Sequence, residues 1–132
     1  NARMVIEQYG VKRLLVPALE SEDFGYELIL SAAERCETAV ERVANDRELS
    51  LGNATCEILV PECETDGNNA SLVLRIELDG VVLLLMGDAE KEAEQALLAR
   101  RGAEFLDCDF LKLVFLKRES VFLKVYFWKF VF

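Results

Sequence analysis

The stretch from Ser71 to Gly102 constrains the fold of this chain more than any other part of its sequence. It contains two apolar runs joined by Asp79-Gly80, then Gly87-Asp88, and then a helical pattern that ends at Gly102. A turn dipeptide between two β-rich runs is a strong signal for a hairpin. The second run, 81–86, contains no polar residue, so we predict a strand buried on both faces. Its exit places the Asp88 carboxylate between a strand and a helix.

The rest of the chain predicts an alternation of short helices and strands. We predict a helix at 1–9, because Gly10 follows it and glycine commonly ends helices. We predict the start of a second helix at 21–23, where a serine is followed by two acids. The helix after Asp88 carries acids in its first turn and arginines in its last. Strands are predicted at 14–17, 38–43, 48–51, 54–60 and 106–113. This order predicts a layered α/β (α+β) fold with a mostly antiparallel or mixed sheet.

The bulk composition describes a folded protein and limits its partners. A chain of 132 residues, 52% of them hydrophobic, is one domain or a piece of one and can bury a core. The net charge of −9 argues against nucleic-acid binding by the acidic body, because phosphate contacts need clustered Lys and Arg. No apolar run reaches the ~18 residues of a transmembrane helix, so no transmembrane segment is predicted.

Histidine is absent and the cysteines are scattered. Imidazole is the commonest transition-metal ligand, so a catalytic zinc centre built from this sequence alone would be very unusual. Cys36, Cys56, Cys63 and Cys108 form no Cys-x-x-Cys pair. This spacing favours small, partly buried thiols over a zinc site.

The last part of the chain differs in composition from the rest. Residues 111–132 hold five of the eight Phe, the single Trp and five of the fifteen Lys and Arg, with one acid. We therefore predict a body at 1–113 and a basic aromatic tail at 114–132. Three interpretations of the tail stay open: further strands, a membrane-surface segment, or a continuation that is not native to this fold, such as a shifted reading frame.

The segments 68–74 and 83–89 resemble the metallo-β-lactamase fold, and more narrowly the hydrolase domain of the ComEC-type competence (DNA uptake) family and its free-standing relatives. Those proteins carry an Asn-rich turn, Ser-Leu-Val-Leu, a short hairpin and a Leu-rich strand that ends in Thr-Gly-Asp-Ala. This chain has Asn68-Asn69-Ala70-Ser71-Leu72-Val73-Leu74 and then Leu85-Met86-Gly87-Asp88-Ala89, with Met86 in place of Thr. The segments 11–17 and 45–52 also fit, so the resemblance covers 1–113.

The resemblance implies that the chain is the C-terminal half of an αββα sandwich with two metal ions, zinc or another divalent pair, at one sheet edge. Asp88 corresponds to the carboxylate that bridges both metals, a task that needs two oxygens. The family's His-x-His-x-Asp-His motif has no counterpart here, and 114–116 stand where a His-His-Gly-Ser loop is usual. We therefore expect this chain alone to bind no metal and to be inactive.

The resemblance also implies what the intact protein does. The family association is phosphodiester hydrolysis during DNA uptake, with DNA a substrate of the intact parent only. A ComEC-type parent would be membrane-associated, and a free-standing relative would be cytoplasmic or secreted. Half of a two-sheet sandwich leaves an apolar face uncovered, so we expect self-association through that exposed half-core.

Other interpretations stay open from the residues alone. Asp88 is suited to cap the N-terminus of the following helix. The chain could be a non-catalytic structural or interaction unit. It could also be a magnesium-dependent enzyme that combines Asp88 with Asp66, Asp107 or Asp109, because hard oxygen ligands need no histidine.

Overall fold

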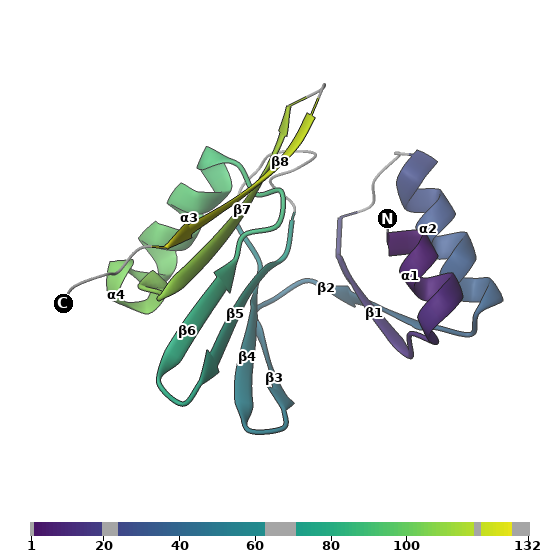
Figure 1. The fold of residues 1–132 in the computed structure, drawn as a ribbon, viewed down its shortest axis with the longest axis horizontal. Helices are drawn as coiled ribbons and strands as arrows, with labels where there is room; N and C mark the ends of the chain where they lie inside the picture. The colour runs from purple at the N-terminus through teal and green to yellow at the C-terminus, as the bar shows by residue number, and fades with distance from the viewer. Residues whose placement is uncertain (1, 20–23, 63–70, 118–119, 128–132) are drawn as a thin grey trace. The chain divides into compact units, whose positions relative to one another are not determined.

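The computed structural model describes residues 2–19, 24–62, 71–117 and 120–127, with 112–117 and 120–127 described by their backbone. The chain divides into two compact units, Asn1–Ala44 and Asn45–Phe132. Both units combine helices with strands (Figure 1), so the predicted mixed α/β class is confirmed. The division predicted between 113 and 114 remains a prediction. Among the described residues, no helix has the length and apolar character needed to cross a membrane.

The first unit is a β-α-β arrangement preceded by a helix. It consists of α1 (Ala2–Tyr9), β1 (Arg13–Pro17), α2 (Phe24–Arg35) and β2 (Ala39–Val43). β1 and β2 pair in parallel, as expected for strands joined by a helical crossover. The Thr38 hydroxyl donates a 2.7 Å hydrogen bond to the carbonyl of Val11, which ties the two strand entrances together. The predicted start of α2 at 21–23 lies outside the described residues.

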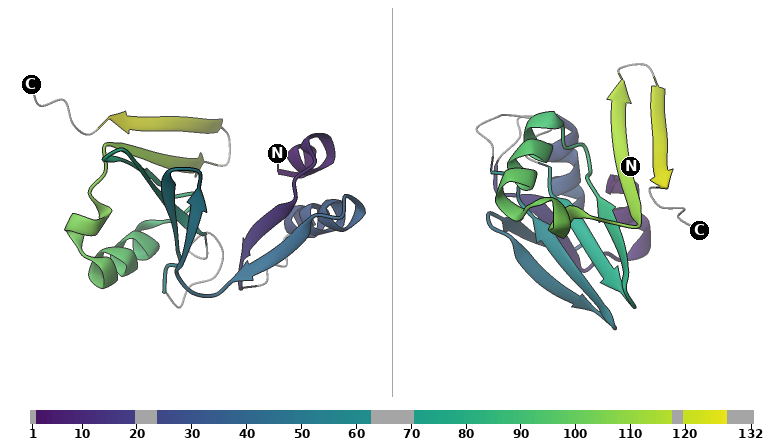
Figure 2. Two further views of the ribbon diagram at one scale, coloured as in Figure 1. Left: turned by 90° about the horizontal axis from the view of Figure 1, so that it is seen from below. Right: turned by 90° about the vertical axis from the view of Figure 1, so that its left-hand side faces the viewer.

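The second unit is a mixed sheet with two helices on one side (Figure 2). Its strand order is β3-β4-β5-β6-β7-β8, and β6–β7 is the only parallel pair among the described strands of this second unit. A parallel pair needs a crossover connection, which α3 and α4 supply. The elements are β3 (Arg47–Leu51), β4 (Ala54–Leu59), β5 (Val73–Leu78), β6 (Val81–Leu85), α3 (Lys91–Arg101), α4 (Ala103–Leu106), β7 (Phe110–Lys117) and β8 (Ser120–Phe127).

The core of the second unit lies between α3 and the sheet. Ala93 and Leu97 of α3 are fully buried, because this helix presents its small and apolar side chains to the strands. From the sheet, the core is completed by Leu59, Val73, Leu84 and Met86. We call this side of the sheet the helix face.

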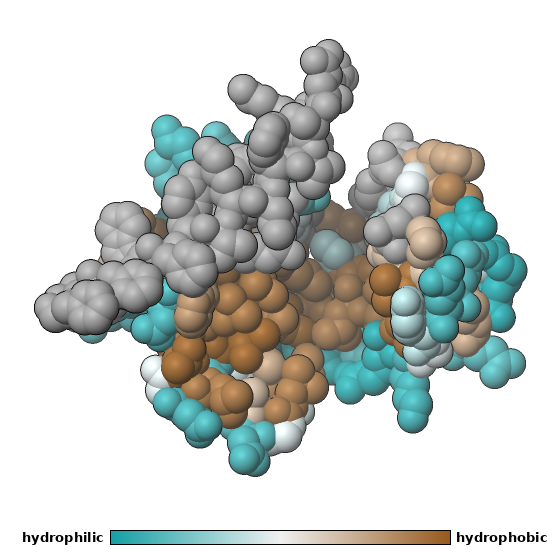
Figure 3. Space-filling view, in the orientation of Figure 1, coloured by the Kyte–Doolittle hydropathy of each residue, from teal (hydrophilic) through white to brown (hydrophobic). Residues whose placement is uncertain are grey.

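The opposite side, which we call the open face, is also apolar. Paired residues share a face, so one row across the sheet reads Leu49, Cys56, Ile76, Leu83 and Phe110. The neighbouring positions on the same face are Leu51, Ala54, Ile58, Leu74, Leu78, Val81 and Leu85, together with the positions of Arg47 beside Ile58 and Lys112 beside Leu85. Hydrophobic residues gather over β4, β5 and β6 on this side (Figure 3).

The open face corrects one prediction for β6. The run 81–86 was expected to be buried on both faces, but Val81 is 47% exposed, whereas Leu84 and Met86 are buried under α3. A strand made entirely of apolar residues can therefore have only one of its two faces covered by other parts of the protein. The prediction is wrong because the sequence pattern shows only that both faces of the strand are apolar. It does not show whether another layer of the protein covers each face.

The strand predicted at 106–113 begins later than expected. Leu106 ends the short helix α4, in which Ala103, Glu104 and Leu106 are good helix formers, and β7 starts at Phe110. β7 then continues to Lys117 and pairs with β8 in antiparallel register. The backbone thus agrees with the interpretation of the tail as further strands.

Candidate functional site

A tight corner follows β6 and carries Asp88. Gly87 has a φ of +60°, and the Ala89 N–H donates a 3.1 Å hydrogen bond to the Met86 carbonyl across the turn. A Cβ atom at Gly87 would lie 3.3 Å from the carbonyl oxygen of Leu72. Both the left-handed backbone and this close approach favour glycine. The corner holds Asp88, half-buried, just beyond the carboxyl end of β6.

Asp88 is not the N-cap of the following helix. α3 begins at Lys91, and its N-cap residue is Glu90, whose side chain makes no capping hydrogen bond. The capping interpretation of Asp88 is therefore wrong, because two further residues separate it from the first turn. Within the part of the chain that the structure describes, the Asp88 carboxylate has no hydrogen-bond or ion-pair partner.

The parallel strand β7 runs to the same edge of the sheet as the Asp88 corner. Leu83 pairs with Phe110 and Leu85 pairs with Lys112, so the carboxyl ends of β6 and β7 point the same way. The backbone of 114–116 continues beyond the end of β6 on this edge. In sheets with parallel strands, ligand sites commonly lie at the carboxyl ends of those strands.

Two of the acids considered as partners for Asp88 lie at the other end of β6. The Asp109 carboxylate accepts a 2.9 Å hydrogen bond from the Val82 N–H, and the Asp109 N–H donates to the Val82 carbonyl. Asp107 is the C-cap of α4 and precedes β7 at this same end. Roughly 13 Å of strand separates Val82 from Met86. A shared metal ion between Asp88 and either acid is thus excluded by distance, and Asp66 lies outside the described residues.

Metal ligands are not grouped in the described residues. No set of three or more His, Cys, Asp or Glu side chains among them is arranged to hold an ion. Asp88 is therefore a lone carboxylate at a sheet edge, which by itself supplies at most two oxygen ligands.

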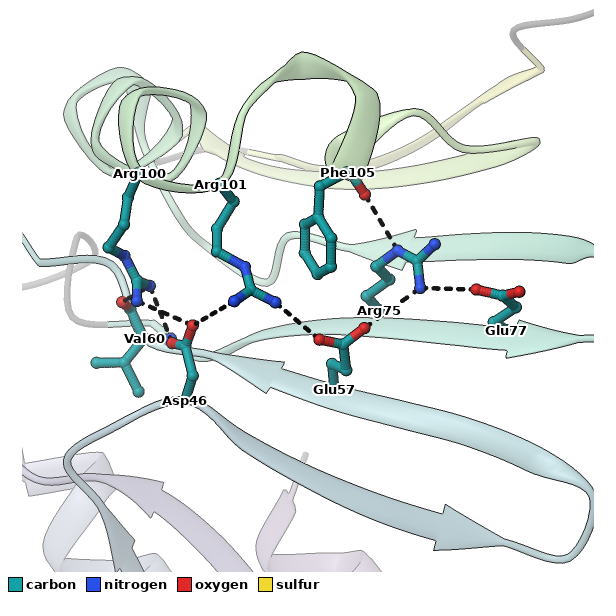
Figure 4. A network of polar contacts seen from close by, with 8 residues as sticks. All are labelled: Asp46, Glu57, Val60, Arg75, Glu77, Arg100, Arg101 and Phe105. Atoms are coloured by element: carbon teal, nitrogen blue, oxygen red, sulfur yellow. Dashed lines mark hydrogen bonds and ion pairs between the residues drawn. The ribbon is translucent and has the colours of Figure 1, made fainter.

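A network of charged side chains that the sequence reasoning missed lies between the sheet and the helices (Figure 4). Asp46 stands before β3 and binds both Arg100 Nη atoms at 2.9 Å. Asp46 also accepts a 2.9 Å hydrogen bond from the Val60 N–H, and Arg100 donates to the Val60 carbonyl at 2.8 Å. This arrangement joins the end of α3 to the start of β3 and the end of β4.

The network continues toward β5 through a second arginine of α3. Arg101 binds Glu57 at 2.8 Å, and Arg75 lies 3.4 Å from the same carboxylate. Arg75 also donates to the carbonyl of Phe105 at 3.1 Å. The Arg101 and Arg75 guanidinium carbons lie 3.9 and 4.9 Å from the centroid of the Phe105 ring, which suits cation–π contacts. We call Asp46, Glu57, Arg75, Glu77, Arg100 and Arg101 the charge network.

The charge network has a structural role. Burial raises the pKa of Asp46, but the hydrogen bonds from Arg100 and the Val60 N–H outweigh it and leave that pKa below its ordinary value. The charged form of Asp46 is thus the form that the fold stabilises. The signal available in the sequence was the Arg100-Arg101 pair at the end of a helix, which was interpreted as a dipole effect alone.

Among curated proteins, the chain is similar to ComE operon protein 3 of Bacillus subtilis (strain 168), with 33% identity over 100 residues. The match covers 74% of this chain but only 13% of that protein. The chain resembles one segment of a ComE operon protein. No protein-family profile and no solved structure matches it.

Proposed function

We propose that this chain is part of a metal-dependent hydrolase of the metallo-β-lactamase superfamily, in which Asp88 is one of the metal ligands. The intact protein would hydrolyse phosphodiesters in a ComEC-type DNA-uptake role. The chain itself has no histidine, so on this proposal it lacks the remaining ligands and is inactive alone. A zinc or other divalent pair would be bound only when those ligands are supplied.

The observation that carries the proposal is the position of Asp88. The carboxylate is half-buried, has no partner among the described residues, and is held at the carboxyl edge of β6 and β7 by a corner that requires glycine. A carboxylate kept unpaired on a rigid corner is available to a cation. Asp88 would be one of the residues that hold a divalent pair, and the chemistry which such a pair would supply is Lewis-acid activation of a water.

Two further observations support the proposal. The open face is apolar, as expected for the inner surface of one sheet in a two-sheet sandwich. The similarity to ComE operon protein 3 extends over 100 residues, and that operon name agrees with the competence family suggested by the sequence motifs. The chain spans 13% of that relative, so the substrate and location of the whole protein are part of the proposal.

A gain of metal affinity tests the assignment of Asp88. Histidine is introduced singly as Val114→His and Phe115→His, because neighbouring strand residues point to opposite faces and only one is expected to face Asp88. We expect one variant to bind Zn²⁺ at least about tenfold more tightly than the wild type, or about 1.4 kcal/mol. Titration calorimetry measures this affinity.

The control variants separate a designed site from incidental binding. Phe110→His places the same ligand at the opposite end of β7, and it should give no gain. Combining the successful histidine with Asp88→Asn should remove the gain. Equal affinity in all variants, or a gain that survives Asp88→Asn, would overturn the metal-ligand assignment.

A second possible function is that of a non-catalytic interaction unit. The apolar open face and the absence of histidine from the sequence favour it. On this alternative Asp88 only shapes the corner. The two functions differ in their response to Asp88→Asn, which would leave every property of an interaction unit unchanged. The magnesium-dependent alternative has no supporting geometry among the described acids, since Asp107 and Asp109 lie at the opposite end of β6 from Asp88.

A further inference from the structure

Ser71 lies against the corner that holds Asp88. It stands just before β5 in the chain, whereas the corner follows β6. A Cβ atom at Gly87 would lie 3.6 Å from the Ser71 Cβ atom and 3.3 Å from the Leu72 carbonyl oxygen. The segment that enters β5 is therefore in close contact with the segment that leaves β6.

The register of β5 and β6 matches Ser71 with Asp88. Leu74 pairs with Leu85, so three positions further outward on each chain Ser71 stands opposite Asp88. The close approach at Gly87 shows that the two chains stay side by side beyond the paired residues. Residues that are matched across antiparallel strands have Cα atoms about 5 Å apart. A serine hydroxyl and an aspartate carboxylate at such positions are within reach of a hydrogen bond.

The two side chains are also complementary in chemistry and both are available. Ser71 and Asp88 are half-buried, and neither side chain has a hydrogen-bond or ion-pair partner among the residues that the structure describes. A hydroxyl can donate one hydrogen bond, and an ionised carboxylate can only accept. A carboxylate that binds a cation is usually held by a hydrogen bond from a second residue, which fixes its orientation. Ser71 is placed to supply that donor.

We propose that Ser71 is a positioning residue for Asp88, and that its hydroxyl donates a hydrogen bond to the carboxylate when the carboxylate holds a divalent cation. This inference rests on the proposed function, in which Asp88 is a metal ligand. Ser71 itself stays off the metal and acts only through Asp88. Removal of such a supporting partner typically costs a site about tenfold or more in metal affinity.

Zinc affinity in the histidine variants of the chain tests the role of Ser71. In whichever of Val114→His and Phe115→His gains affinity, adding Ser71→Ala should weaken Zn²⁺ binding about tenfold in titration calorimetry. Ser71→Thr keeps the hydroxyl and should keep the affinity. When Asp88→Asn is also present, Ser71→Ala should cause no further loss, because the hydroxyl acts through that carboxylate.

The matched control is Ser50→Ala, which removes a hydroxyl from an exposed residue of β3, a strand separated from β6 by β4 and β5. It should leave the affinity unchanged. Circular dichroism first establishes that each variant is folded, and Ser71→Gly is a second variant without the hydroxyl.

The outcomes separate this inference from the function on which it rests. An affinity that Ser71→Ala leaves unchanged, an equal loss in Ser50→Ala, or a further loss in the presence of Asp88→Asn would overturn the role of Ser71 and leave the metal role of Asp88 standing. If neither histidine variant gains affinity, both proposals are overturned.

Discussion

The two faces of the second sheet show opposite relations between polarity and exposure. On the helix face, charged side chains of β4 and β5 lie under α3 and α4 and are bound to one another (Figure 4). On the open face, apolar side chains reach the solvent at Leu51, Leu78 and Val81. The usual arrangement of an antiparallel sheet is apolar toward the covering layer and polar toward water.

The difference indicates how each face contributes to the protein. The helix face combines a small apolar core with ion pairs that have specific geometry, so it holds α3 in one position on the sheet. The open face is mostly apolar, and its side chains are stabilised when water is excluded from them. Stability should therefore depend more on residues of the helix face than on residues of the open face.

The largest expected effect comes from the core of the helix face. Leu97→Ala removes a fully buried side chain between α3 and the sheet, so we expect a loss of about 3 kcal/mol in the free energy of unfolding. Urea denaturation measures it. Leu98→Ala, one residue along the same helix but half-exposed, should cost less than about 0.5 kcal/mol. Similar losses in both variants would mean that α3 is not packed on the sheet through Leu97.

The next effect comes from the charge network. Asp46→Ala leaves the Arg100 guanidinium and the Val60 N–H without their acceptor, and we expect a loss of about 2 kcal/mol. Glu62→Ala is the control, because its carboxylate lies 3.5 Å from Arg100 but its side chain is 71% exposed. Thermal unfolding of the two variants should separate them. Equal losses of stability in the two variants would contradict the proposal that Asp46 links α3 to the sheet.

The pH dependence of stability sharpens the same point. The folded-state pKa of Asp46 is below its ordinary value of 3.8, so its contribution is present above that value and is lost as the pH falls below it. The difference in unfolding free energy between the wild type and Asp46→Asn should therefore shrink between pH 5 and pH 2.5. Urea titrations across this pH range measure the difference. A difference that does not change with pH would rule out a stabilising role for the ionised Asp46 carboxylate.

A smaller effect is expected at the Asp88 corner. Gly87→Ala forces a left-handed backbone onto alanine and brings its Cβ to 3.3 Å from the Leu72 carbonyl, so we expect a cost of about 1–2 kcal/mol. Gly52→Ala has a similar φ of +62° but no neighbouring atom within 4 Å. Comparing the two unfolding free energies isolates the cost of the close approach. If Gly52→Ala costs more, the corner is less crowded than described.

The smallest effect on folding is expected on the open face. Val81→Ser changes an exposed strand residue, so the unfolding free energy of the monomer at low concentration should shift by about 0.5 kcal/mol or less. Denaturation at 1 µM checks this expectation, and a loss above 1 kcal/mol would show that this face belongs to the folding core.

The local elements were predictable because their signals are local. The turn at Asp79-Gly80 and the glycine that ends α3 were both predicted correctly. The hairpin formed because Asp79 and Gly80 both accept positive φ. The start of β7 was missed because 103–106 forms a helix whose signal is too short to separate from a strand.

The contacts between elements were not predictable. Nothing in the sequence pairs Asp46 with Arg100, which is 54 positions away, so the charge network emerged only from the fold. Asp88 could be selected as a candidate because its corner has a recognisable motif. Its lack of a partner among the described residues, and the position of Asp109 at the far end of β6, depend on the register of β6 with β7.

The single parallel pair in the second sheet has a consequence for how the chain acquires its structure. The hairpins β3–β4 and β5–β6 close over turns of two residues, a process that takes microseconds. Leu83 must instead find Phe110, 27 positions later, after the crossover has passed over the sheet. During synthesis, the edge of β6 therefore stays unsatisfied until the ribosome has released β7. In that interval the nascent chain is most vulnerable to pairing with the wrong strand.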